Sequence, residues 1–129
     1  MILYVETSAV AKLMIEEPES VRLAAHLDRA VEQDDSLLSS MLLETELRRL
    51  AVRTGVGQAV VTRLLERFDL LEIDRSLYRE AGLLPGPYLR SLDAIHVAAA
   101  LRANADAMVT YDVRQADAAD GAGLSVQSP

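Results

Sequence analysis

The sequence predicts a single α/β domain in three layers, in which a short, mostly parallel central sheet is flanked by helices. Short apolar segments alternate with longer amphipathic segments along the chain, and this alternation is typical of a parallel sheet with helical crossovers. The 129 residues fit one domain, 1–129, that is large enough to bury a core of its own. Because half of the residues are apolar but only 4% are aromatic, Leu, Val and Ala must fill that core.

The first half of the chain begins with a strand at residues 2–5, where four apolar residues precede Glu6. Pro18 separates two amphipathic segments, and Gly55 ends a third. On the second segment, residues 23, 24, 27 and 31 share the face expected to point inward. The elements predicted here are helices at 9–17 and 19–31, a very short strand at 37–38, a helix from a cap at Ser39 or Ser40 to Arg53, and a helix at 57–68.

The second half continues the alternation of strand and helix. A Pro- and Gly-containing loop at 82–87 precedes a helix rich in small residues, for which Ser91 is the expected N-cap. The elements predicted here are a strand at 70–74, a helix capped by Ser76 and ending near 81, a helix from 91, a buried strand at 107–110, a helix at 114–119 and a strand at 124–126.

Composition excludes several classes of protein. No apolar run approaches the roughly 18 residues of a membrane span, and the first residues do not resemble a secretion signal. The chain has no Cys, which favours a reducing cytoplasm. The net charge of −7 argues at first against a nucleic-acid partner. Only Lys12 among the 13 basic residues is a lysine, however, and arginine is the residue suited to phosphate contacts.

Three acidic residues lie where predicted elements begin or end. Glu6 follows the first strand, Asp112 follows the strand near 107–110, and Asp93 lies in the first turn of the helix from Ser91. The carboxyl ends of parallel strands share one edge of the sheet and open into a crevice, and a helix N-terminus stabilises a negative charge. We therefore expect these three carboxylates to meet at one site.

A fourth acid comes from the helix that ends near Arg53. Glu46 has apolar residues one turn before and after it, so it lies on the inward stripe, where a carboxylate must be paired or bound to a metal. Glu44 has Arg48 four residues ahead and is predicted to form a solvent-facing ion pair. Glu46 is therefore the candidate, and Glu44 is assigned to the surface.

The four acids suggest a cation site made entirely of oxygen ligands. Such a donor set suits Mg²⁺ or Mn²⁺, and the sequence leaves open whether one or two ions bind. Thr7, Ser8 and Thr110 are placed to hydrogen-bond the carboxylates or metal-bound water. From spacing alone, the alternative that these acids are scattered over a solvated surface also stays open.

Five short motifs, in order along nearly the whole chain, resemble those of the PIN domain, specifically the VapC-type toxins of bacterial toxin–antitoxin pairs. The motifs are Tyr4-Val-Glu6-Thr-Ser8-Ala, Thr45-Glu46-Leu-Arg-Arg49, Ser91-Leu-Asp93-Ala-Ile-His96, Thr110-Tyr-Asp112-Val-Arg114 and Gly123-Leu-Ser-Val. The resemblance implies a PIN-like fold and an Mg²⁺-dependent endoribonuclease that cuts tRNA or rRNA. It also implies a cognate VapB-type antitoxin that holds the enzyme inactive, and a homodimer.

One residue departs from the family pattern. The first acid of the family is usually Asp, and Glu6 carries one more methylene, which moves the carboxylate by about 1.5 Å. Because a misplacement of about 1 Å can cost roughly a hundredfold in rate, an alternative hypothesis is a catalytically weakened PIN domain that acts mainly by binding RNA or its antitoxin. Glu6 stays in the predicted site because of its position at the end of the first strand.

The remaining candidates have simpler interpretations. His96, one turn after Asp93, is interpreted as a buried hydrogen-bonding residue rather than a ligand. Arg49 and Arg114 are candidates for RNA contact, and Arg114 is favoured because it follows Asp112 at the mouth of the crevice. The apolar positions around 60–71 are assigned to either the core or a dimer interface. A phosphoryl-accepting receiver domain is disfavoured, because the only lysine, Lys12, lies on the first helix.

Overall fold

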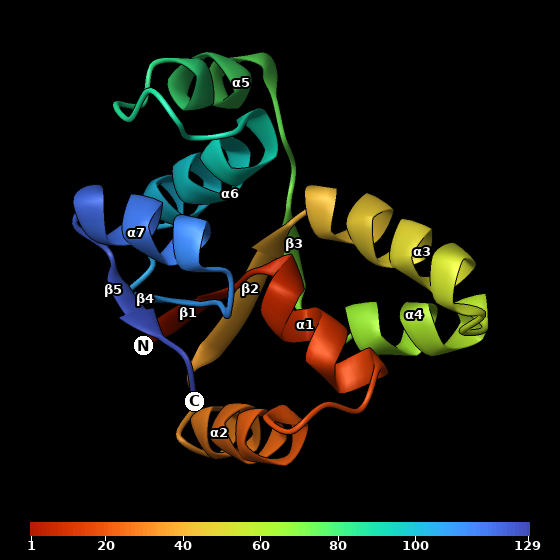
Figure 1. Cartoon of the computed structure of the whole chain (residues 1–129). Coiled ribbons are helices and arrows are strands. Elements are labelled where there is room, and N and C mark those ends of the chain that lie inside the picture. Colours follow the sequence, from red (N-terminus) through yellow and green to blue (C-terminus); the bar gives the residue numbers. More distant parts are fainter.

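The computed structural model describes all residues, 1–129, as a five-stranded parallel sheet between two groups of helices (Figure 1). The strand order is β3-β2-β1-β4-β5, and every pair of neighbouring strands is parallel. The predicted three-layer α/β class is therefore confirmed. The elements are β1 (Ile2–Val5), α1 (Thr7–Met14), α2 (Ser20–Glu32), β2 (Ser36–Ser40), α3 (Leu42–Thr54), α4 (Gln58–Leu65), β3 (Asp69–Leu71), α5 (Arg75–Gly82), α6 (Ser91–Arg102), β4 (Ala107–Val109), α7 (Val113–Gly121) and β5 (Ser125–Gln127).

The two faces of the sheet have separate apolar cores. In β1, Leu3 and Val5 point to one face and Tyr4 to the other, because side chains alternate along a strand. Helices α1 to α4 cover the first face, and α5, α6 and α7 cover the second. All three of these side chains are at most 2% exposed, so the strand is covered on both sides, as a parallel sheet requires.

The strand order reverses direction beside β1. The chain goes from β1 outward to β2 and β3, and then returns to place β4 and β5 on the other side of β1. In open parallel sheets, ligands bind in the crevice at the carboxyl ends of the strands where this reversal occurs. In this chain Glu6 directly follows β1 and Thr110 directly follows β4, so the reversal lies at the predicted acidic site.

Three predicted helix caps are wrong. Ser39 and Ser40 belong to β2, where both are fully buried, and α3 begins after Met41 without a side-chain cap. Asp74, not Ser76, caps α5 by accepting from the backbone N–H of Leu77. The N-cap of α6 is Arg90, and its side chain makes no capping bond.

Other boundaries differ by a few residues. The strand expected at 70–74 is shorter and earlier, at Asp69–Leu71, and the helix expected at 57–68 ends at Leu65. Val31 of α2 is exposed, and Ala30 takes the inward position instead. Most of the apolar positions assigned to either the core or a dimer interface belong to the first core, whereas Val60 is exposed; the core members are Val61, Leu64, Leu65 and Phe68. None of the helices has the length and apolar character needed to cross a bilayer.

Candidate active site

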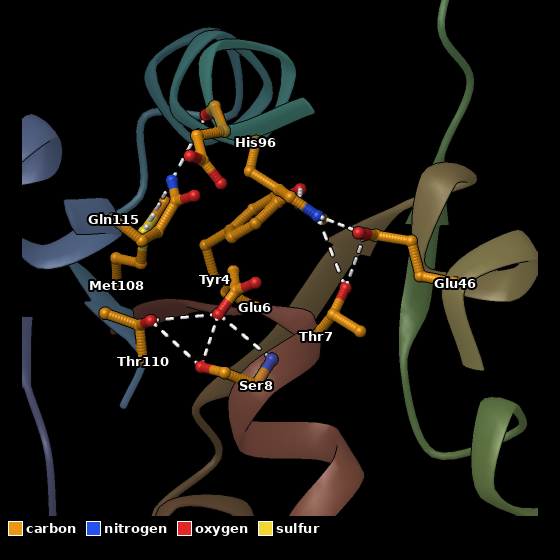
Figure 2. Close-up of polar contacts among 10 residues, drawn as sticks. Tyr4, Glu6, Thr7, Ser8, Glu46, His96, Met108, Thr110 and Gln115 are labelled. Carbon is orange, nitrogen blue, oxygen red and sulfur yellow. Dashed lines mark hydrogen bonds and ion pairs between the residues drawn. The ribbon is translucent and has the colours of Figure 1, made fainter. Parts of the chain in front are cut away.

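Four carboxylates lie at the carboxyl end of the sheet or on the helices beside it, and we call them the acidic cluster. The acidic cluster consists of Glu6 after β1, Glu46 on α3, Asp93 in the first turn of α6 and Asp112 after β4. Figure 2 shows separate sets of hydrogen bonds around Glu6 and around Glu46. The structure therefore brings together the segments that the sequence predicted to meet.

Glu6 is the N-cap of α1, and its carboxylate is held by three donors. Its Oε2 atom accepts from the backbone N–H and the hydroxyl of Ser8 and from the hydroxyl of Thr110, the last at 2.9 Å. Figure 2 shows this carboxylate between the two hydroxyl side chains. The residue is only 6% exposed, and the chain supplies it with donors that fit the longer Glu side chain. Ser8 and Thr110 thus hold a carboxylate, as predicted.

Glu46 is held from the opposite side by a second set of donors. Its Oε1 atom accepts from the Thr7 hydroxyl at 2.6 Å and from Nε2 of His96 at 2.7 Å (Figure 2). Burial raises the pKa of the Glu46 carboxyl, but the hydrogen bond and charge of His96, with the bond from Thr7, outweigh burial and lower it. Glu46 is therefore ionised at neutral pH, and Thr7 supports it as predicted.

His96 is a buried positioning residue, as the sequence indicated. It is 1% exposed, and its Nδ1 atom lies 2.7 Å from the hydroxyl of Tyr4. Nε2 of His96 donates to the Glu46 carboxylate, and Nδ1 shares a second hydrogen bond with the Tyr4 hydroxyl. Tyr4 was not identified from the sequence. The only feature of the sequence that could have indicated its role is its hydroxyl, in a strand that is otherwise apolar.

Asp93 has a less favourable environment than Glu6 or Glu46. Its Oδ2 atom is buried and has no hydrogen-bond partner. Burial and the negative charge of Asp112 raise the pKa of the Asp93 carboxyl, with a smaller contribution from Glu46, while Arg114 and His96 oppose the rise. A buried oxygen that lacks a donor and lies among like charges is a position suited to a cation.

Asp112 lies at the start of α7, and Gln115 of α7 contacts the backbone of Asp93. Asp112 caps α7, because its Oδ1 atom accepts from the backbone N–H groups of Arg114 and Gln115. The Gln115 side chain, which is fully buried, donates to the backbone oxygen of Asp93 at 3.2 Å. Its own Oε1 atom is buried and unpartnered. Gln115 was not identified from the sequence either, because nothing in the pattern showed that it would face α6.

The donor set of the acidic cluster fits a divalent cation, although the side chains do not converge on one point. Glu6, Glu46 and Asp112 each use a single carboxylate oxygen for hydrogen bonds within the chain, so the other oxygen is free. No three acidic or histidine side chains are arranged around a common point as they stand. The free oxygens, together with Oδ2 of Asp93, are hard ligands of the kind that Mg²⁺ and Mn²⁺ prefer.

The predicted arginines are exposed and the predicted surface pair is formed. Arg114 is exposed, makes no ion pair, and lies close enough to act on the charge of Asp93. Arg49 is exposed on α3 and makes no ion pair either. Their contact with RNA stays a prediction. Glu44 pairs with Arg48 at 3.1 Å on the surface, as expected.

The sequence and the structure were compared with known proteins. The PIN domain family model matches residues 3–121. Ribonuclease VapC35 of Mycobacterium tuberculosis is 42% identical, and the match covers 98% of this chain and 96% of that protein. Two similar solved structures share the fold. They are VapBC2 of Rickettsia felis bound to a DNA fragment from its promoter (TM-score 0.75, 16% identity, 98% of each chain) and VapC20 of Mycobacterium tuberculosis, a toxin that cleaves the sarcin–ricin loop (TM-score 0.74, 18% identity, 98% of this chain and 99% of that chain).

Proposed function

We propose that this chain, which belongs to the PIN domain family and is a ribonuclease toxin of the VapC type, cleaves RNA at the acidic cluster. The observation that carries the proposal is the buried, unpartnered Oδ2 atom of Asp93 beside the charges of Asp112 and Glu46. Such an arrangement raises the free energy of the folded protein without a cation, and a bound cation would lower it. The catalytic residues we propose are therefore the four members of the acidic cluster.

The family implies a divalent cation, and the all-oxygen donor set leads us to propose Mg²⁺ or Mn²⁺ as that ion. When bound, such an ion lowers the pKa of a water molecule and stabilises the charge that develops at a phosphodiester. The chain itself contributes orientation. Ser8 and Thr110 fix one carboxylate, and Thr7 and His96 fix another, so little reorganisation is needed when RNA arrives.

The alternative of a weakened PIN domain that only binds RNA or its antitoxin is not favoured. It was motivated by Glu6, and that side chain is 6% exposed with three hydrogen-bond donors around one oxygen. A residue that merely disabled the site would have no need of such donors. We infer that the site has adapted to Glu.

The partners we propose are RNA and an antitoxin. Curated relatives are ribonucleases, and one structural neighbour is a VapBC assembly. We propose that the substrate is a structured RNA, tRNA or rRNA, that a VapB-type antitoxin inhibits the enzyme, and that the toxin forms a homodimer in the cytoplasm. Co-purification with the product of a neighbouring reading frame tests the antitoxin. Light scattering of the purified chain tests the dimer.

A matched pair of substitutions on α3 tests the function itself. In purified protein with Mg²⁺ and cellular RNA, Glu46→Gln should lower the cleavage rate about a hundredfold, because it removes a charge at the proposed cation site. Glu44→Gln, two residues away on the surface, should stay within about twofold of the original chain. Sequencing of the RNA ends locates the cut. Equal rates for both variants, or cleavage that persists in EDTA, would contradict metal-dependent cleavage at the acidic cluster.

A further inference from the structure

A cavity of about 450 Å³ lies between the loop that joins α5 to α6 and the helix α7. Its volume falls in the range of small-molecule sites, about 300–1,000 Å³. The apolar part of its lining comes from the loop, from α6 and from the end of α7. These residues are Leu84, Pro85, Leu89, Val97, Ala118 and Ala122. The functional site described above does not use this cavity.

Three chemically distinct side chains also line the cavity: Tyr88, Arg114 and Asp117. The ring of Tyr88 is 90% exposed, and its hydroxyl makes no hydrogen bond within the chain. The guanidinium of Arg114 and the carboxylate of Asp117 also have no ion-pair partner in the structure, and both residues are exposed. A mostly apolar cavity with a few unpaired polar groups is the usual form of a small-ligand site.

The cavity lies beside the acidic cluster along α6 and α7, although none of the four acids lines it. Val97 on its wall lies one helical turn after Asp93 on α6, and Arg114 lies one turn before Ala118 on α7. The charge of Arg114 acts on the Asp93 carboxyl, so one guanidinium borders both places. A molecule in the cavity that carries a phosphate would present that phosphate to Arg114, on the side of the carboxylates.

We propose that this cavity binds one unpaired nucleobase of the RNA substrate, next to the phosphate that is cut, an inference that rests on the proposed ribonuclease function. RNA-binding proteins take up splayed bases by stacking them on aromatic rings and by hydrogen bonds to their edges. In this chain Tyr88 supplies the ring, Arg114 contacts the phosphate, and Asp117 accepts an N–H from the base edge. A carboxylate only accepts, and the single edge donor of uracil, N3–H, lies between two carbonyl oxygens that repel a carboxylate, so bases with an exocyclic amino group bind better than uracil.

The chemistry of the lining favours a nucleotide over a peptide as occupant. An apolar peptide side chain would fill the cavity but would leave the cation and the carboxylate at its rim unused. A nucleotide uses all three features, because its base is flat and apolar on its faces, its edge donates, and its phosphate is anionic. If a segment of the antitoxin occupies the cavity instead, substitutions of the lining will weaken inhibition by the antitoxin and leave RNA cleavage unchanged.

The probes are nucleoside 5′-monophosphates, with ribose 5-phosphate as the control that lacks a base. In NMR titrations of the labelled chain, GMP, AMP and CMP should shift the amide signals of residues 84–89 and of the second half of α7. Ribose 5-phosphate should leave the loop signals unchanged, and UMP should bind more weakly. Equal shifts with ribose 5-phosphate, or shifts confined to other parts of the chain, would overturn the proposal.

Substitutions of the lining give a second, independent readout. Tyr88→Ala should weaken nucleotide binding about fivefold or more, the usual loss for a stacking ring. Tyr78→Ala is the matched control, since Tyr78 is 56% exposed on α5 and does not line the cavity. Ala118→Phe, which fills the cavity, should abolish binding, and thermal unfolding checks that each variant is folded. If Ala118→Phe disturbs α7, Tyr88→Ala still tests the proposal, because Tyr88 lies in an exposed loop and its loss should not affect folding.

RNA cleavage separates failure of this site from failure of the enzyme. If the original chain cleaves RNA and both cavity variants cleave the same positions at the same rate, the base site is overturned and the ribonuclease stands. If the original chain cleaves no RNA, the proposed function fails whatever the titrations show. If the variants lose only inhibition by the antitoxin, the cavity binds a peptide and the proposal is overturned.

Discussion

The surroundings of Glu46 and Asp93 differ sharply, although both carboxylates are partly buried at the same end of the sheet. Glu46 accepts hydrogen bonds from Thr7 and His96, and its pKa is lowered. Asp93 has a buried oxygen without any donor, and its pKa is raised by burial and by the charge of Asp112. The difference indicates that the chain itself stabilises the Glu46 half of the site, and we propose that a bound cation stabilises the Asp93 half.

The largest effect is expected for Asp93→Asn, which tests whether the Asp93 charge binds the proposed cation. We expect cleavage to fall about a thousandfold, the upper range for loss of a charge-stabilising group, and the increase in thermal stability on addition of Mg²⁺ to disappear. In the absence of metal the variant should melt no earlier than the original chain, because the substitution removes a repelled charge. Calorimetry with and without Mg²⁺ measures both effects. A variant that melts earlier and still cleaves would show that Asp93 is an ordinary structural residue.

His96→Ala tests the half that we regard as stable by itself. The ring is 1% exposed and bridges Tyr4 and Glu46, so its loss leaves a cavity, a Tyr4 hydroxyl without this partner, and a Glu46 carboxylate that keeps only the bond from Thr7. We expect the free energy of unfolding to fall by about 2–3 kcal/mol. His26→Ala is the control, because His26 is only partly buried and makes a single hydrogen bond to Gln127. It should cost about 1 kcal/mol in the same denaturant titration. Equal losses would contradict a special role of the buried ring.

Glu6→Asp tests whether the site has adapted to the residue that departs from the family pattern. Shortening the side chain draws its carboxylate away from the hydroxyls of Ser8 and Thr110. We therefore expect the single-turnover cleavage rate to fall about tenfold, with the fold unchanged by circular dichroism. A large gain in rate, with stronger growth arrest on expression, would instead show that the present chain is impaired by Glu6.

The smallest effect is expected at Asp74, another aspartate at the start of a helix but outside the site. Arg102, Ser76 and the backbone N–H of Leu77 lower the pKa of its carboxyl. A lowered pKa in the folded state stabilises the protein above the ordinary aspartate value of about 3.9, and the contribution is lost as the pH falls below it. Asp74→Asn should therefore melt slightly earlier at pH 7, and the difference should shrink in melts below about pH 4. A difference that stays constant with pH would mean that the charge is not involved.

The sequence predicted the location of the site because that location depends on local patterns. Short apolar strands ending in Glu6 and Asp112 indicate a parallel sheet, and a parallel sheet brings strand ends together. The inward direction of Glu46 followed from helical periodicity. These predictions needed only the order of helices and strands and the spacing of apolar residues along each of them. The structure agrees with both.

Features that depend on packing between distant segments could not be predicted. Ser39 and Ser40 have the residue type of a helix cap, and only the pairing of β2 with β1 and β3 shows that they belong to a strand. The unpartnered oxygen of Asp93 depends on how α6 and α7 pack together. The cavity beside Tyr88 depends on the path of a loop rich in Pro and Gly, which no periodicity describes.

The order of the four acids along the chain has a consequence for synthesis on the ribosome. Glu6 emerges first, whereas Asp112 and β4, which pairs with β1, are made after more than three-quarters of the polypeptide. A nascent or prematurely terminated chain that ends before β4 lacks both the fourth carboxylate and the strand that positions Thr110. If the four carboxylates carry the proposed activity, such a chain is not a competent nuclease, and the activity arises only after β4 has been made.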